Sequence, residues 1–98
     1  MATTIHRYRL KVVDEQTVPM PAGAEVLHVA HRPWSQLPDI DVWARVDSSQ
    51  PDTPRTFRIA GTGHPLDDRP HHHLGSALLP GQHAVFHVFE ILSSNDTT

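Results

Sequence analysis

The chain has 98 residues, enough for one domain with a single modest core, and its formal net charge of −3 gives no electrostatic reason to expect nucleic acid or a membrane as partner. The absence of cysteine excludes a disulfide framework, thiolate zinc sites and a cysteine nucleophile. Nine histidines make the charge, and with it the solubility, strongly dependent on pH.

The N-terminal segment carries charges at Arg7, Arg9 and Lys11, where a signal peptide would need an unbroken apolar stretch. No segment has the length of an apolar membrane span. We therefore expect a cytosolic protein that forms one domain over residues 1–98, with a polar tail at about 93–98.

Apolar and polar residues alternate along most of the chain, which predicts an all-β domain. No segment repeats apolar residues at the spacing of a helix. The predicted strands cover residues 5–13, 25–31, 40–47, 56–60, 74–79 and 82–90. We expect a small antiparallel barrel or sandwich of five to seven strands.

The first predicted strand, 5–13, turns Leu10 inward and its basic residues outward. Residues 14–24 follow it and contain two prolines, Pro19 and Pro21. Because proline and glycine interrupt regular structure, this segment is predicted to be a loop.

The next two predicted strands are separated by a proline-containing loop over 32–38. In the strand 25–31, Leu27 and Val29 are predicted to face the core. In the strand 40–47, Asp41, Trp43, Arg45 and Asp47 are predicted to face outward. The inward residues of that strand are Ile40, Val42, Ala44 and Val46.

In the second half of the chain, residues 48–54 are predicted to be a polar turn region and 61–72 an irregular stretch. The strand between them turns Phe57 and Ile59 inward. Pro80-Gly81 has the residues that a type II turn requires at its two central positions.

The last predicted strand is apolar on both faces, with Val85 and Phe89 on one and Phe86 and Val88 on the other. Such a strand is usually covered on both sides. The cover is either the rest of a barrel or sandwich or a second subunit, and the small size of the chain favours the subunit. We therefore expect a homo-oligomer, most simply a two-fold dimer, with an interface drawn from Val85, Phe86, His87, Val88 and Phe89.

The sequence Gly61-Thr62-Gly63-His64 invites comparison with phosphate-binding loops, because glycines let backbone N–H groups approach an anion. It lacks the Lys and Ser or Thr of a P-loop and the third glycine of a dinucleotide fingerprint. The favoured interpretation is a sharp turn with glycine at positive φ. The same four residues remain candidates for binding a small nucleotide-like ligand.

The histidines are the remaining candidates for chemistry. His71 and His73 would share one side of an extended segment and are weak metal candidates, so that no physiological metal or cofactor is predicted. His83 and His87 also share a face, and partial burial in a sheet is favoured over a catalytic or pH-sensing pair. No catalytic residue can be assigned, because triads are recognised by geometry and not by order.

Two tryptophans are the candidates for a binding surface. Trp34 lies in a predicted loop, and Trp43 lies on the outward side of a strand beside Arg45. Exposed Trp and Arg are enriched at the energetic centres of protein interfaces. The alternative is a tryptophan that covers one end of a barrel.

Laid in chain order, several short motifs resemble a family of small phage and prophage proteins of unknown function, common in actinobacterial phages. The matching pieces include Tyr8-Arg9-Leu10-Lys11-Val12, Gly61-Thr62-Gly63-His64-Pro65 and Phe86-His87-Val88-Phe89-Glu90. The resemblance covers about residues 5–90 and leaves out the 71–73 histidine run and the 32–38 loop. It implies an accessory protein in the bacterial cytoplasm, with no established activity.

The leading hypothesis is a non-enzymatic accessory protein that binds a host or phage protein, with no nucleic acid or membrane as partner. The alternative is a binder of a small nucleotide-like ligand that counters host signalling or defence. An enzyme is the third hypothesis.

Overall fold

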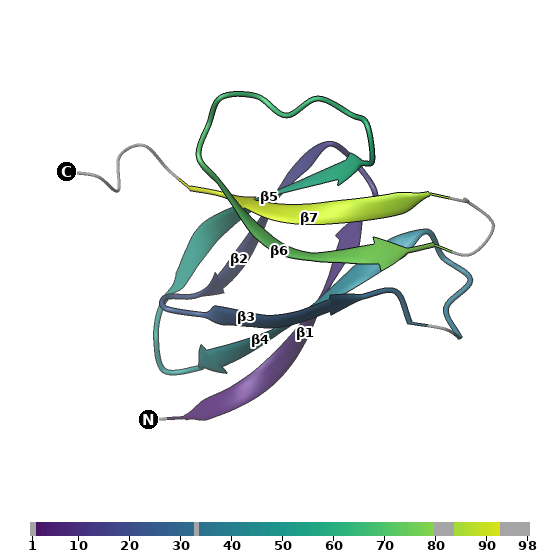
Figure 1. Cartoon of the computed structure of the whole chain (residues 1–98). Coiled ribbons are helices and arrows are strands. Elements are labelled where there is room, and N and C mark those ends of the chain that lie inside the picture. Colours follow the sequence, from purple (N-terminus) through teal and green to yellow (C-terminus); the bar gives the residue numbers. More distant parts are fainter. Residues whose placement is uncertain (1, 33, 80–83, 93–98) are drawn as a thin grey trace.

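The computed structural model describes residues 2–32, 34–79 and 84–92, and these form seven β-strands (Figure 1). The strands are β1 (Thr3–Lys11), β2 (Glu15–Pro21), β3 (Glu25–Ala30), β4 (Asp39–Asp47), β5 (Asp52–Gly61), β6 (His71–Leu78) and β7 (Val85–Ile91). The prediction of an all-β fold is confirmed. The described ranges contain no helix that could cross a membrane.

The strands form two antiparallel sheets, one in the order β1-β4-β3 and the other in the order β2-β5-β7-β6. The two sheets are stacked and do not close into a barrel, so the fold is a sandwich (Figure 1). The molecule measures 41 × 34 × 16 Å. The smallest of these dimensions is what two packed sheets about 10 Å apart require.

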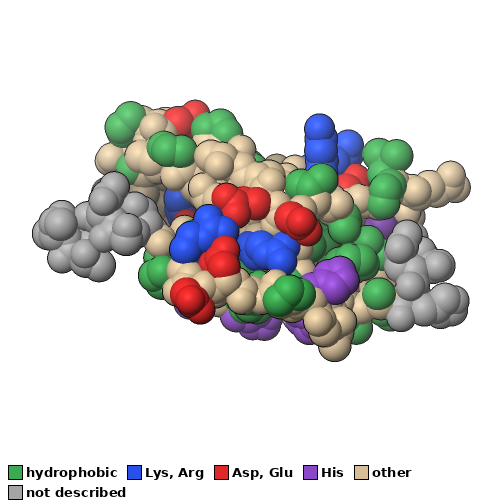
Figure 2. All heavy atoms as spheres, turned by 90° about the horizontal axis from the view of Figure 1, so that it is seen from above, with side chains coloured by type: hydrophobic (Ala, Val, Ile, Leu, Met, Phe, Trp, Pro, Cys, Tyr) green, Lys and Arg blue, Asp and Glu red, His purple; other side chains and the backbone are tan. Residues whose placement is uncertain are grey.

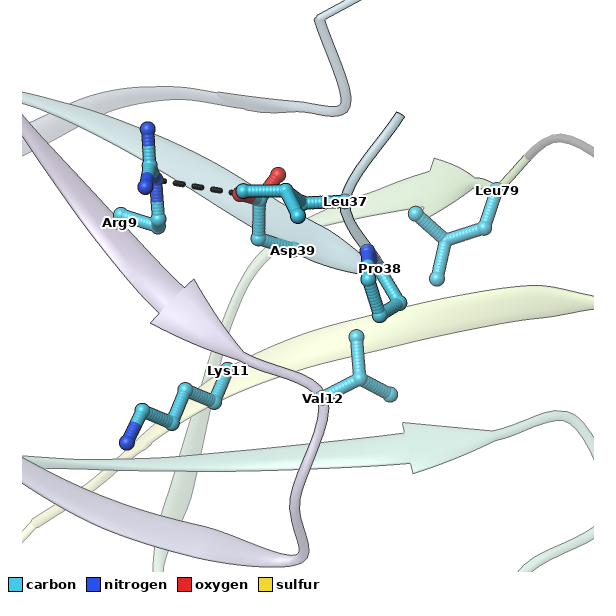
Figure 3. Close-up of a pocket in the computed structure, with 7 residues that line it drawn as sticks. All are labelled: Arg9, Lys11, Val12, Leu37, Pro38, Asp39 and Leu79. Atoms are coloured by element: carbon cyan, nitrogen blue, oxygen red, sulfur yellow. Dashed lines mark ion pairs between the residues drawn. The ribbon is translucent and has the colours of Figure 1, made fainter. Parts of the chain in front are cut away.

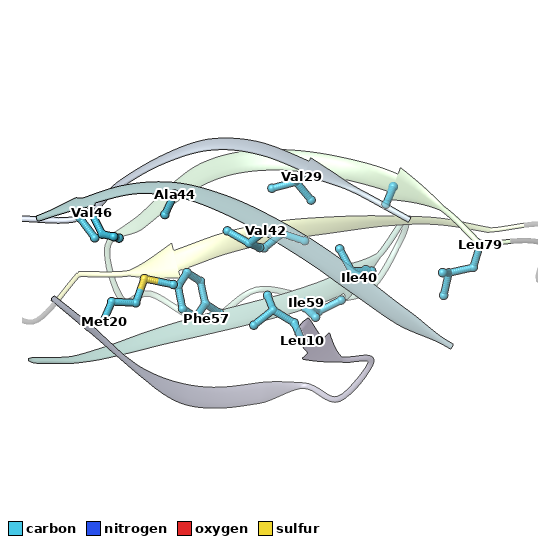
Figure 4. Close-up of a cluster of buried hydrophobic side chains, with 13 residues drawn as sticks. Leu10, Met20, Val29, Ile40, Val42, Ala44, Val46, Phe57, Ile59 and Leu79 are labelled. Atoms are coloured by element: carbon cyan, nitrogen blue, oxygen red, sulfur yellow. The ribbon is translucent and has the colours of Figure 1, made fainter. Parts of the chain in front are cut away.

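The core lies between the sheets (Figure 4). The four inward residues predicted for β4 are all buried, and so are Leu10, Phe57, Ile59 and Val88. Each of them follows the alternation of its strand, because successive residues point to opposite faces. Apolar alternation therefore identified most of the core.

The prediction of a loop over residues 14–24 was wrong, because β2 occupies most of it. Pro19 of β2 lies opposite Pro54 of β5 in the register. β2 is an edge strand, and β7 pairs with β5 only from Thr56 onward. The two prolines therefore lie where few ladder hydrogen bonds are needed, which is where sheets accept proline. The predicted polar turn likewise ends earlier, since β5 begins at Asp52.

The prediction that Leu27 faces the core was also wrong. A β-bulge between Val26 and His28 shifts the register against β4. A bulge reverses the alternation locally. As a result Val26 packs against the core and Leu27 is 41% exposed, while Val29 is buried as predicted.

The histidine run does not belong to an irregular loop, because His71 already begins β6. β7 lies inside its sheet, between β5 and β6, with Phe86 and Val88 packed in the core. These two members of the predicted interface therefore point into the sandwich, whereas Val85, His87 and Phe89 lie on the outer face of the sheet, and the dimer itself stays a prediction. The Pro80-Gly81 turn, His83 and the 93–98 tail lie outside the described residues.

Candidate functional site

The outer face of the three-stranded sheet carries Trp43 and Arg45 on β4. The Trp43 ring lies against the His28 ring of β3, with the centroids 5.5 Å apart and the planes at 42°. Arg45 pairs with Glu25 at 3.1 Å, and both side chains are more than half exposed. An exposed cation therefore lies next to a partly covered indole on the same face of the sheet.

The loop between β3 and β4 is held against this face by buried polar contacts. The His31 ring is buried, with Nδ1 2.8 Å from the carbonyl oxygen of Asp39 and Nε2 3.2 Å from that of Ser35. Arg32 forms an ion pair with Asp41, whose carboxylate is fully buried. Asp41 faces outward as predicted but is not solvated, because the loop folds back over it.

Trp34 lies on this anchored loop, and 75% of its surface is exposed. We call Trp34, Trp43 and Arg45 the tryptophan face. All three were predicted to bind a partner, and all three belong to β4 or to the loop that precedes it. The other predicted binding residues, Gly61 to His64, lie at and just after the end of β5 in the opposite sheet. The sequence-predicted set is therefore divided between the two sheets.

The Gly61–His64 segment forms a tight turn in which the backbone N–H groups of Gly61, Thr62 and His64 are bonded within the protein. The N–H of His64 donates to the Gly61 carbonyl, and the N–H of Thr62 donates to that of Val85. The N–H of Gly61 donates to Nδ1 of His64 at 3.3 Å. Gly63 has a φ of +93°, as the turn interpretation requires. The turn does not offer the converging N–H groups that bind a phosphate.

A chain of hydrogen bonds connects two histidines on the outer face of the four-stranded sheet. The Ser76 hydroxyl lies 3.2 Å from Nε2 of His73 and 2.8 Å from Nδ1 of His87. Nε2 of His87 lies 2.8 Å from the Thr62 hydroxyl. The third group in this hydrogen-bonded chain is the Thr62 hydroxyl, whereas a catalytic triad has a carboxylate at that position.

The metal candidates His71 and His73 both lie against the ring of Phe89, with centroids 5.8 and 5.2 Å from it. Over the described part of the chain, no group of three or more metal-ligating side chains comes together. The contact of Ser76 with both His73 on β6 and His87 on β7 could not be predicted from the sequence. A bulge between His73 and Gly75 shifts the register of β6 against β7 and so determines which residues of the two strands lie opposite each other.

Charged side chains gather where the 62–70 loop crosses the sandwich, as Figure 2 shows for the top of the molecule. Arg69 lies 2.7 Å from Glu15 of β2 and 2.5 Å from Asp67. Its hydrogen bonds lower the pKa of Glu15 and hold the pKa of Asp67 at about 2. Arg58 also bonds this loop, through the carbonyl of Pro65. The cluster attaches the loop to β2, which is a structural role.

A cavity of about 610 Å³ opens at one end of the sandwich (Figure 3). Its wall comes from the end of β1, from the residues before β4 and from the residue after β6. We call it the end cavity, and it is lined by Arg9, Lys11, Val12, Leu37, Pro38, Asp39 and Leu79. Sequence reasoning did not find it, because three segments far apart in the chain form it.

These surfaces belong to a small β-sandwich with Trp43 on the outer face of one sheet, Trp34 exposed on the loop before β4, and a cavity at one end that is lined by both apolar and charged residues. The model of one protein family, Domain of unknown function (DUF7352), matches residues 1–97, and the chain belongs to this family. No curated protein and no solved structure is significantly similar to the chain.

Proposed function

We propose that this chain is a phage- or prophage-encoded accessory protein that binds a host or phage protein in the bacterial cytoplasm, without catalysing a reaction. The phage setting is supported by the sequence motifs that run from Tyr8 to Glu90. The binding role is supported by the tryptophan face.

The exposure of Trp34 on an anchored loop is the observation that carries the proposal. A free indole in water forgoes the stabilisation that its burial would give. The loop is held by His31 and by the Arg32–Asp41 pair, so little conformational freedom remains to be lost on binding. Rigid, exposed aromatic side chains of this kind dominate protein interfaces.

Arg45 indicates the chemistry of the partner. Its pairing with Glu25 is exposed to solvent and therefore contributes little to stability. A carboxylate on the partner can take the place of Glu25 at little cost. We therefore expect a partner that offers an apolar recess for Trp34 and an acidic side chain for Arg45.

The Ser76–His87 pair is weaker support for an enzyme than the tryptophan face is for a binding protein. Acyl transfer by a serine requires an oriented base and donors for the oxyanion. The nitrogen of His87 that a carboxylate would orient is bonded instead to the Thr62 hydroxyl.

The test is affinity capture from the lysate of an actinobacterial host, followed by titration of the purified partner. Trp34→Ala should weaken the partner's affinity by roughly 30-fold, the effect of a central interface residue. Leu66→Ala is the matched control, because Leu66 is an exposed apolar residue on the 62–70 loop of the opposite sheet. Equal binding by the wild type and both variants would refute the assignment to the tryptophan face.

A further inference from the structure

We propose that the end cavity is a binding site for a small aliphatic carboxylate, a role independent of the tryptophan face. The cavity volume of about 610 Å³ lies within the range typical of small-molecule sites. Four of its seven lining residues are apolar, and the other three are Arg9, Lys11 and Asp39. Such a lining suits a molecule with a hydrocarbon body and one charged group.

The charges at the cavity select the sign of the ligand. Arg9 and Asp39 form an ion pair, with Nε 3.1 Å from Oδ2, which balances the charge of the buried aspartate. Lys11 has no ion-pair partner among the residues that the structure describes. The cavity therefore carries a net charge of about +1, which one carboxylate would neutralise.

The geometry of Arg9 leaves it able to bind a second carboxylate. A guanidinium has five N–H donors in a planar fork, and the ion-pair contact of Arg9 Nε with Asp39 Oδ2 does not have the geometry of a hydrogen bond. The Arg9 side chain is half exposed, so donors remain accessible to a ligand. Arginine in this state is suited to a bidentate contact with a carboxylate.

The polar and apolar parts of the lining lie at opposite ends of the cavity. In Figure 3, Arg9 and Asp39 lie on the left, Leu79 lies on the right, and Pro38 and Val12 lie between. Leu37 also lines the cavity and is itself exposed. The Lys11 ammonium points away from Arg9 in Figure 3, but Lys11 is exposed, and its flexible stem allows it to turn towards a ligand. A carboxylate bound at Arg9, and met there by Lys11, would direct its alkyl chain towards Leu79, so that apolar surface of the ligand and of the cavity is removed from water.

Calorimetric titration with four probes tests both the charge and the chain. Octanoate should bind saturably and about tenfold more tightly than octanol, which lacks the charge. Butanoate should bind at least about tenfold more weakly than octanoate, since each buried methylene raises affinity roughly fourfold. Octylammonium has the same chain and the opposite charge, and it should bind more weakly than octanol.

Two variants and one control assign the binding to the cavity. Lys11→Gln should weaken octanoate about tenfold and leave octanol unchanged. Leu37→Ser should weaken both ligands. Arg7→Gln is the matched control, because Arg7 is an exposed cation on the same strand that does not line the cavity. All three side chains are exposed, so the fold should tolerate their replacement.

Three results would overturn the proposal. The first is octanoate that fails to saturate at millimolar concentration. The second is octylammonium that binds more tightly than octanoate, which would mean that Asp39 and not the cations selects the ligand. The third is an equal loss of octanoate affinity in the Arg7 and Lys11 variants, which would mean that only the overall charge of the protein matters.

Discussion

The carboxylate of Asp41 is fully buried, and its charge is compensated by Arg32 alone among the ion pairs of the described residues. Removing one partner of a buried pair leaves an uncompensated charge and costs roughly 3–5 kcal/mol. We therefore predict that Arg32→Ala lowers the free energy of unfolding by about this amount, measured by chemical denaturation.

Arg45→Ala is the control for that measurement, since the Arg45–Glu25 pair is largely exposed. Its loss should cost less than about 1 kcal/mol. An equally small loss in both variants would show that the loop does not seal Asp41 from water. A combined Arg32→Met, Asp41→Leu variant should recover part of the stability, because apolar residues of similar size often replace a buried ion pair without loss.

Asp67 gives the protein a predictable response to acid. Arg69 holds the pKa of Asp67 at about 2, below its ordinary value of 3.8, chiefly by side-chain hydrogen bonds. A carboxyl whose pKa is lowered on folding adds stability above its unfolded pKa and loses it as the pH falls through its folded pKa. We therefore predict that this contribution declines between about pH 4 and pH 2, in urea unfolding followed against pH.

Asp67→Asn removes the titrating group and should flatten the stability curve in that window. Asp68→Asn is its control, because the neighbouring Asp68 forms no ion pair among the described residues. Curves of identical slope for the two variants would contradict the role given to Arg69.

At the scale of the elements, β6 of one sheet packs closely against β3 of the other at Gly75, next to a bulge in the pairing of β6 with β7. A Cβ atom added at Gly75 would lie 2.9 Å from Cβ of Val29, which is closer than side-chain carbons pack. The bulge between His73 and Gly75 bends β6 at this point. We predict that Gly75→Ala destabilises the fold by about 1–3 kcal/mol, the usual cost of overpacking, measured by thermal unfolding.

Asparagine at two glycines separates this crowding from backbone strain. Gly23 has a φ of +81° and open space around it, and asparagine tolerates that conformation. Gly23→Asn should therefore cost less than about 1 kcal/mol, whereas Gly75→Asn should cost more than the alanine variant. If Gly75→Asn were the milder of the two, the contact with Val29 would not be limiting.

Alternation predicted the inner strands β4, β5 and β7 and also the edge strands β1, β3 and β6, because each of these segments carries inward apolar residues at every second position. β2 was missed because its prolines are acceptable only at an edge, and edge position is not encoded locally. Leu27 was misplaced because a bulge depends on the partner strand as well as on the bulged one.

The features of the candidate surfaces likewise divide into those that could be predicted from the sequence and those that could not. Trp34 and Trp43 could be named from the sequence, since a tryptophan in a loop or on an outward strand position is visible there. The burial of Asp41 could not, because alternation tells which face a residue occupies and not whether a loop covers that face. The end cavity depends on tertiary packing throughout.

At the scale of the whole molecule, the position of β7 changes how a second subunit could bind. Because β7 pairs with both neighbours, it has no free backbone edge, and only its outer face can meet another chain. On that face His71 and His73 already cover part of Phe89. The apolar surface that remains is concentrated at Leu78 and Val85, which lie opposite each other in the register.

We predict a dimer formed through this outer face. Leu78 is 64% exposed and Val85 is 38% exposed, and their burial against a two-fold copy would remove a paired apolar patch from water. Sedimentation velocity should show a dimer at micromolar concentration. A Leu78→Lys, Val85→Lys variant should sediment as a folded monomer, because both side chains lie on the surface. Val88→Lys should instead unfold the protein, because Val88 lies in the core. A wild-type protein that remains monomeric at several hundred micromolar would refute the interface.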